Sequence, residues 1–137
     1  MRSVLFAGLL AVLMAGGCSS SAPPTSVASD EFPALRDLST DTIMMVGPDA
    51  SMGNWAAVRK AAGSKVFAEK VAKFESATIP TSIPDGAALK EKTVKALQNF
   101  ITVAKTTSDK ESISGAWKQL HDTIGELNAA AEGRKPS

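Results

Sequence analysis

The clearest pattern of apolar and polar positions lies near the C-terminal end of the chain. Over residues 113–131 the large apolar residues follow one another at alternating steps of four and three: Ile113, Trp117, Leu120, Ile124, Leu127 and Ala131. This spacing places them along one side of an α-helix, as in the seam of a helix bundle. Ser108 followed by Glu111 predicts a capping box at the start of this helix, and Gly133 predicts its end.

Two earlier stretches have the same helical spacing. The first covers residues 30–46, with Pro33 accepted in the first turn and Gly47-Pro48 expected to end the helix. The second starts after Asn54, a good N-cap, and runs to Phe74, with a kink expected at Gly63-Ser64. Their apolar positions are Phe32, Leu35, Leu38, Ile43 and Val46, then Trp55, Val58, Ala62, Val66, Phe67, Val71 and Phe74.

A loop and a further helix lie between these stretches and the last one. Two prolines predict a loop over residues 78–84, and Asp85 is expected to cap a helix that runs to about Thr106. Residues 107–109 then form a short turn, and no stretch alternates with the period of two that a strand requires. We therefore predict an all-α domain, an antiparallel up-down four-helix bundle over residues 31–132, followed by a tail at 133–137. Trp117→Asp is expected to unfold it.

The N-terminus has a different character. Arg2 is followed by the apolar run Val4–Met14, then by small residues and Cys18. The run is too short for a bilayer core, which needs about 20 apolar residues, and it fits a secretory signal. These residues resemble the signal and lipobox of bacterial lipoproteins, except that Ala15 stands where the family usually has Leu. An ordinary signal peptide cut near Ala22 is the alternative.

The lipoprotein resemblance implies a location. Residues 1–17 would be the signal peptide, and Cys18 would carry the fatty acyl groups, palmitate among them. The Ser, Ala, Pro and Thr residues of 18–30 predict a flexible tether. The resemblance also implies a cell-envelope protein that is anchored to a membrane and faces the periplasm. Ser19, in place of Asp, favours the outer membrane over the inner one.

Charge and cysteine content exclude several classes of function. The full chain has 15 Lys and Arg and 14 Asp and Glu. Loss of residues 1–17 removes only Arg2, which leaves equal numbers of each sign and no electrostatic attraction to nucleic acid. Cys18 is the single cysteine, and its acylation would leave no thiol for disulfides, thiolate metal sites or covalent haem.

His121, the single histidine, is the candidate cofactor-binding residue, and a surface or boundary residue without a ligand is the other interpretation. The stretch 115–122 resembles the haem-attachment region of cytochrome c prime, a periplasmic four-helix bundle, and residues 54–58 resemble the start of that family's second helix. Trp117 and Leu120 stand where the two haem-binding cysteines would be, so covalent haem is excluded. Related b-type cytochromes pair a histidine with a methionine on the first helix. Antiparallel packing is expected to place His121 opposite Leu38 and Ser39, with Trp117 in the porphyrin volume.

Other chemistry has less support. Met44, Met45 and Met52 lie near one turn, and thioethers bind Cu(I), although methionine is also an ordinary core residue. The sequence contains no catalytic arrangement, so we predict no enzyme. The expected role is binding a protein partner or supporting the envelope. The resemblance to cytochrome c prime also implies a homodimer formed through the first two helices as one possible form. A carrier of non-covalent haem or copper is the alternative.

Overall fold

The computed structural model describes residues 31–133, and this part of the chain is all-α, as predicted. It contains five helices: α2 (Pro33–Ser51), α3 (Trp55–Ala62), α4 (Lys65–Ser76), α5 (Gly86–Thr106) and α6 (Lys110–Ala131). No strand occurs within residues 31–133. The predicted signal, tether and tail fall on residues 1–30 and 134–137, outside the described residues.

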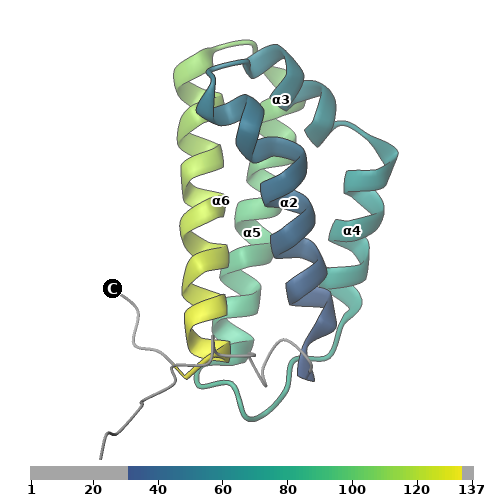
Figure 1. Cartoon of the computed structure of the whole chain (residues 1–137), viewed down its shortest axis with the longest axis vertical. Helices are drawn as coiled ribbons and strands as arrows, with labels where there is room; N and C mark the ends of the chain where they lie inside the picture. The colour runs from purple at the N-terminus through teal and green to yellow at the C-terminus, as the bar shows by residue number, and fades with distance from the viewer. Residues whose placement is uncertain (1–30, 134–137) are drawn as a thin grey trace, which may run out of the picture.

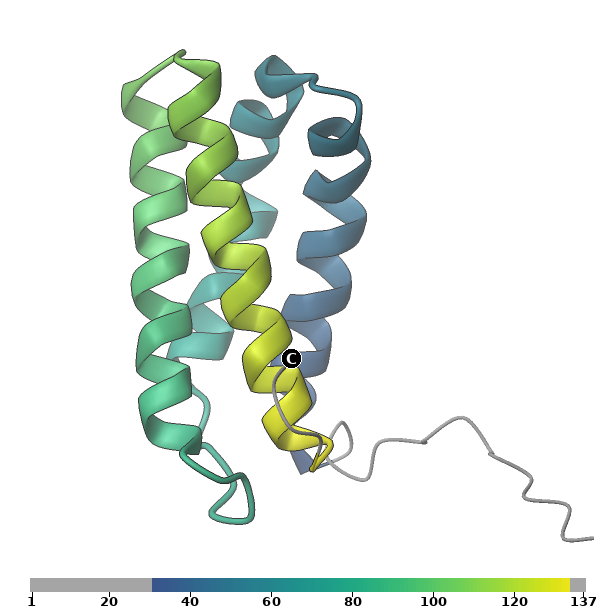
Figure 2. The same ribbon diagram turned by 90° about the vertical axis from the view of Figure 1, so that its left-hand side faces the viewer.

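The helices lie side by side along one long axis (Figure 1). In that view α2 rises, α3 lies at the top, α4 descends, α5 rises and α6 descends. Figure 2 shows α6 between α5 and α2 on the neighbouring face. We call the end with Phe32, the 77–85 loop and Ala131 the near end, and the end with the turns at 52–54 and 107–109 the far end. These two ends are about 30 Å apart, because α5 has 21 residues.

The first two predicted helices differ from the structure. α2 does not stop at Gly47 but continues through Pro48 to Ser51. Pro48 lies in the last turn of α2 and cannot donate a hydrogen bond to the Met44 carbonyl. Met44 is exposed, so water can replace that donor. The expected kink at Gly63-Ser64 is a complete break between α3 and α4. Ser64 has an extended conformation, and its hydroxyl accepts a hydrogen bond from the Phe67 amide at 3.2 Å.

Two predicted caps are also wrong in detail. The N-cap of α6 is Asp109, one residue later than predicted, and its Oδ2 accepts hydrogen bonds from Ser112 N at 2.8 Å and Ser112 Oγ at 2.5 Å. One carboxylate oxygen of Asp109 thus serves both donors of Ser112. Asp85 precedes α5 as predicted, but it has a left-handed φ of 52°, and its side chain makes no capping hydrogen bond.

The core runs along the axis of the bundle. The predicted seam of α6 is buried at Ile113, Leu120, Ile124 and Leu127, whereas Trp117 and Ala131 are only partly buried. Three aromatic rings connect α4, α5 and α6: the Phe67 and Phe100 centroids are 6.1 Å apart, and Phe100 and Trp117 are 5.7 Å apart. Among the described helices, none has the length and apolar character needed to cross a membrane.

Candidate functional site

The candidate lipidation residue, Cys18, lies outside the described residues. Its acylation therefore stays a prediction from the sequence. What the structure does describe is the domain that such an anchor would hold. Candidate binding groups lie in three of its regions: the surroundings of His121, the charged faces, and two hollows on the surface.

His121 lies on the surface of α6. Its side chain is 58% exposed, its ring centroid is 6.0 Å from that of Trp117, and its Nδ1 is 4.0 Å from Asp122 Oδ1. Trp117 lies one turn earlier and packs against buried Phe100. The histidine is thus the outermost ring of an aromatic row that begins in the core.

The level of His121 relative to α2 differs from the prediction. Asn128 Nδ2 donates a hydrogen bond to Ser39 Oγ at 3.0 Å, which sets the register of α6 against the antiparallel α2. Seven residues further toward the far end on each helix, His121 is level with Val46 rather than with Leu38 and Ser39. The expected alignment is wrong because the midpoints of the two helices are offset.

This register brings the methionines of α2 to the level of His121 without pairing them with it. Met44 is 71% exposed, and Met45 is partly buried against the core. With 100° per residue, Met44 and Met45 lie on other sides of α2 than Ser39, the residue that faces α6. A histidine–methionine pair across α2 and α6, as in b-type cytochromes, is not formed by this arrangement.

The remaining candidate metal ligands are dispersed. Met52 is 74% exposed, like Met44, whereas Met45 packs on the core, so the three thioethers do not share one environment. Within residues 31–133, no three His, Cys, Asp or Glu side chains gather as a metal site.

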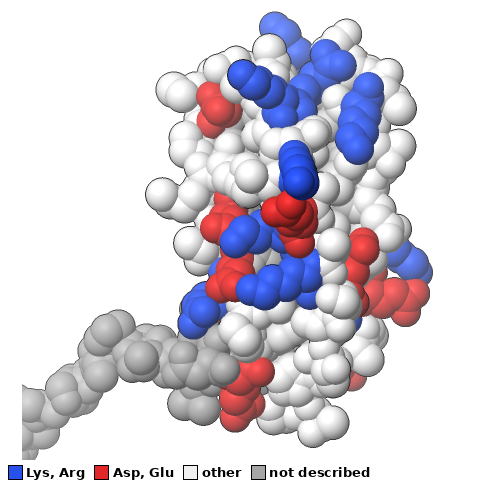
Figure 3. Space-filling view, turned by 90° about the vertical axis from the view of Figure 1, so that its right-hand side faces the viewer, with Lys and Arg blue, Asp and Glu red and all other residues white. Residues whose placement is uncertain are grey.

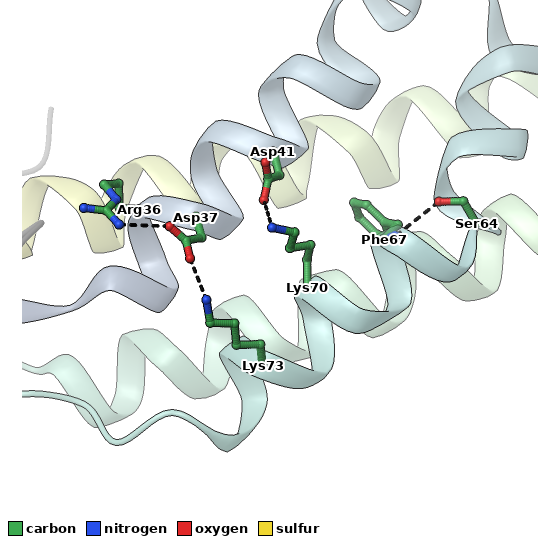
Figure 4. A network of polar contacts seen from close by, with 7 residues as sticks. All are labelled: Arg36, Asp37, Asp41, Ser64, Phe67, Lys70 and Lys73. Carbon is green, nitrogen blue, oxygen red and sulfur yellow. Dashed lines mark hydrogen bonds and ion pairs between the residues drawn. The ribbon is translucent and has the colours of Figure 1, made fainter.

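Ion pairs join α2 to α4 (Figure 4). Lys73 Nζ is 2.7 Å from Asp37 Oδ2, Arg36 is 3.2 Å from Asp37 Oδ1, and Lys70 Nζ is 2.7 Å from Asp41 Oδ2. Lys73, and after it Arg36, hold the pKa of Asp37 below its ordinary value of 3.8. These charges neutralise one another, so this face is best explained as a contact between helices.

Basic residues are distributed unevenly on the same side of the molecule. In the upper part of Figure 3, Lys and Arg have few Asp or Glu beside them, whereas lower down the two signs are mixed. Four basic residues of α3, α5 and α6 near the far end make no ion pair among the described residues: Arg59, Lys60, Lys105 and Lys110.

Two of these residues line a hollow of about 290 Å³ at the far end. We call it the far-end hollow, and its lining is formed by Gly53, Asn54, Trp55, Ala56, Arg59, Ser108 and Lys110. Arg59 is partly buried and held in place, because its Nε donates a hydrogen bond to the Ala104 carbonyl at 2.9 Å. Trp55 is also partly buried and packs against the core.

A second hollow, of about 340 Å³, lies along the outer side of α5 and α6. Its two lysines have acidic partners: Lys92 Nζ is 2.5 Å from Glu126 Oε2, and Lys118 Nζ is 2.6 Å from Asp122 Oδ2. Charge is therefore balanced within this hollow, unlike the far-end hollow. Of these two hollows, the far-end hollow is the one whose basic residues have no acidic partner in the described part of the chain.

Comparison with known proteins finds no match for this chain. The chain matches no protein-family model, and no curated protein or solved structure resembles it closely enough to count as a match. The likeness to lipoprotein signals and to cytochrome c prime therefore depends on the residues quoted above.

Sequence reasoning missed the far-end hollow. Trp55 and Arg59 are four residues apart and share one side of α3. The predicted helix was therefore enough to indicate that these two side chains are neighbours. Ser108 and Lys110, however, come from a segment much later in the sequence, at the start of α6. Only the fold shows that the α2–α3 turn and the α5–α6 turn lie together.

Proposed function

We propose that this protein is a membrane-anchored lipoprotein of the bacterial cell envelope. It faces the periplasm and is attached to the outer membrane in preference to the inner one. Cys18 carries the lipid, residues 18–30 act as a tether, and an up-down four-helix bundle, with its second arm split into α3 and α4, acts as a binding module. Its role is to bind a partner rather than to catalyse a reaction, either another molecule or a second copy of the chain.

The observation that supports this proposal is that the attachment point of the tether and the far-end hollow lie at opposite ends of the domain. Glu31, which would follow the tether, lies at the near end, where its Oε2 accepts a hydrogen bond from Ser82 Oγ at 2.9 Å. The far-end hollow is lined by residues at the start of α3 and at the start of α6, which lie at the other end of the bundle. A tether attached at the near end leaves the far end accessible from the periplasm. The unpaired Arg59 and Lys110 are thus placed where a partner can reach them.

The first test concerns Cys18. The full chain would be expressed in a bacterium that processes lipoproteins, with Cys18→Ser and, as the matched control, Ser19→Ala. We expect the wild type and S19A to enter the detergent phase and to have a mature N-terminal mass that includes acyl chains, because more than one chain gives stable anchoring. The C18S chain should lack both properties. A wild-type product with a free Cys18 thiol, or one cut near Ala22, contradicts the proposal.

The second test separates a binding module from a haem carrier. Haem would be titrated into the purified chain and into His121→Ala while the Soret band is recorded. We expect no His121-dependent change, because Met44 and Met45 lie on other sides of α2 than the side that faces α6. A shifted Soret band that is lost in H121A would establish a haem carrier in place of the proposed role.

A further inference from the structure

The polar groups of the far-end hollow are mostly unused hydrogen-bond donors. Within residues 31–133, Arg59 and Lys110 have no acidic partner, and neither the Trp55 indole N–H nor the Ser108 hydroxyl makes a hydrogen bond. Asn54 uses its Nδ2 on Asp49 Oδ1 at 3.0 Å. No carboxylate is part of the described lining. Such a set of donors matches an anion and has little to offer a cation.

The donors line the same hollow as an aromatic ring. Trp55 and Arg59 come from one side of α3, while Lys110 comes from the first turn of α6, across the hollow. The hydrogen bond from Arg59 Nε to the Ala104 carbonyl leaves the terminal guanidinium nitrogens available for a ligand. Indole faces accept flat or apolar groups, and indole N–H groups donate at their edge.

We infer that the far-end hollow binds small organic anions, in which a carboxylate or phosphate contacts Arg59 and Lys110 and a flat apolar part lies on Trp55. This inference depends on the proposed binding role and names its ligand class. A volume of about 290 Å³ lies at the lower limit of ligand sites, which favours a ligand of one ring. The hollow is open to water, so we expect weak binding, and the Kd should not exceed about 1 mM.

The test uses Trp55 fluorescence in the full chain. Trp117→Phe removes the only other tryptophan and keeps an aromatic ring against Phe100. Phenyl phosphate, benzoate and inorganic phosphate would be titrated, with benzyl alcohol as the uncharged control. We expect saturable changes with phenyl phosphate or benzoate, and the stronger of the two identifies phosphate or carboxylate as the preferred group.

Variants assign the signal to the hollow. Lys110→Gln should weaken binding about 10-fold, the loss expected from one charged hydrogen bond, and Arg59→Gln at least as much. Lys118→Gln is the matched control, because it removes an α6 lysine that is already paired with Asp122. Lys110 is exposed, so K110Q should keep its circular-dichroism spectrum even where R59Q loses stability.

The inference would be overturned by no saturation with any organic anion up to about 10 mM, by equal binding in W117F and its K110Q derivative, or by equal binding of benzyl alcohol and benzoate. Binding of inorganic phosphate as strong as that of phenyl phosphate would also overturn it, because the ring would then contribute nothing. The same titration on the Cys18→Ser chain keeps this inference separate from acylation, since either can fail alone.

Discussion

Arg59 Nε donates a hydrogen bond to the backbone carbonyl of Ala104 at 2.9 Å and so joins α3 to the last turn of α5. The last four carbonyls of a helix have no donor within it, and Ala104 is one of these in α5. One side chain therefore satisfies a free carbonyl, connects two helices and holds a guanidinium at the far-end hollow.

The first prediction concerns stability at this contact. Arg59→Met keeps an apolar stem but removes the donor, so we expect the free energy of unfolding to fall by about 1–2 kcal/mol. Lys60→Met, its exposed neighbour without an ion pair, should stay within about 0.5 kcal/mol of wild type. Urea denaturation followed by circular dichroism measures both. Equal values for the two variants would show that the contact to Ala104 contributes nothing.

The second prediction separates two positions of the α6 seam. Leu120 is fully buried, so Leu120→Asp should abolish the helical spectrum, and Leu120→Ala should cost about 3 kcal/mol. Trp117 is only partly buried, and an aspartate there can reach water. We therefore expect Trp117→Asp to fold with about 2 kcal/mol less stability, which replaces the expectation of unfolding drawn from the sequence. Thermal melts distinguish these results, and an unfolded W117D would restore the earlier expectation.

The difference at Trp117 shows what periodicity alone can establish. Spacing by three and four identified the side of α6 that carries the core, and Ile113, Leu120, Ile124 and Leu127 are all buried. The same spacing cannot tell the centre of that side from its edge, because the edge depends on where α5 and α2 lie. His121, one turn beyond Trp117, is exposed for the same reason.

Helix ends were less predictable than helix sides. Pro48 and Gly47 predicted a stop, yet α2 continues to Ser51, because the lost hydrogen bond lies at an exposed residue. Asp109 replaced Ser108 as the cap by offering one carboxylate to two donors of Ser112. Local competition of this kind involves differences of about 1 kcal/mol, which residue type alone does not decide. The sequence could not predict the far-end hollow for another reason, since its two halves come from segments that are far apart along the chain, residues 53–59 and 108–110.

The third prediction is a dependence of stability on pH. The pKa of Asp37 is lowered from 3.8 in the folded state, by Lys73 first and then by Arg36. A lowered pKa means that the contribution of Asp37 is complete above about pH 3.8 and is lost as the pH falls through its folded value. The stability difference between wild type and Asp37→Asn should thus be constant near neutral pH and shrink below about pH 4. Near neutral pH this stability difference should be smaller in a Lys73→Met background, and a difference that does not depend on Lys73 would contradict the pairing.

The fourth prediction compares glycines that alanine should affect in opposite directions. Gly86 is buried at the start of α5, where a Cβ would lie 3.1 Å from Ile79 Cδ1 and 3.2 Å from Ile83 Cβ. Gly125 is in the interior of α6, and a Cβ there meets nothing within 4 Å. Helix propensity alone favours alanine by about 1 kcal/mol at an interior position, so Gly125→Ala should stabilise the protein by about that amount. At Gly86 the crowding by Ile79 and Ile83 opposes the gain, and we expect Gly86→Ala to be neutral or destabilising. Urea midpoints measured side by side decide the matter: a G86A gain equal to that of G125A would mean that the 77–85 loop is free to move away from α5, and that the near end is less tightly packed than the structure has it.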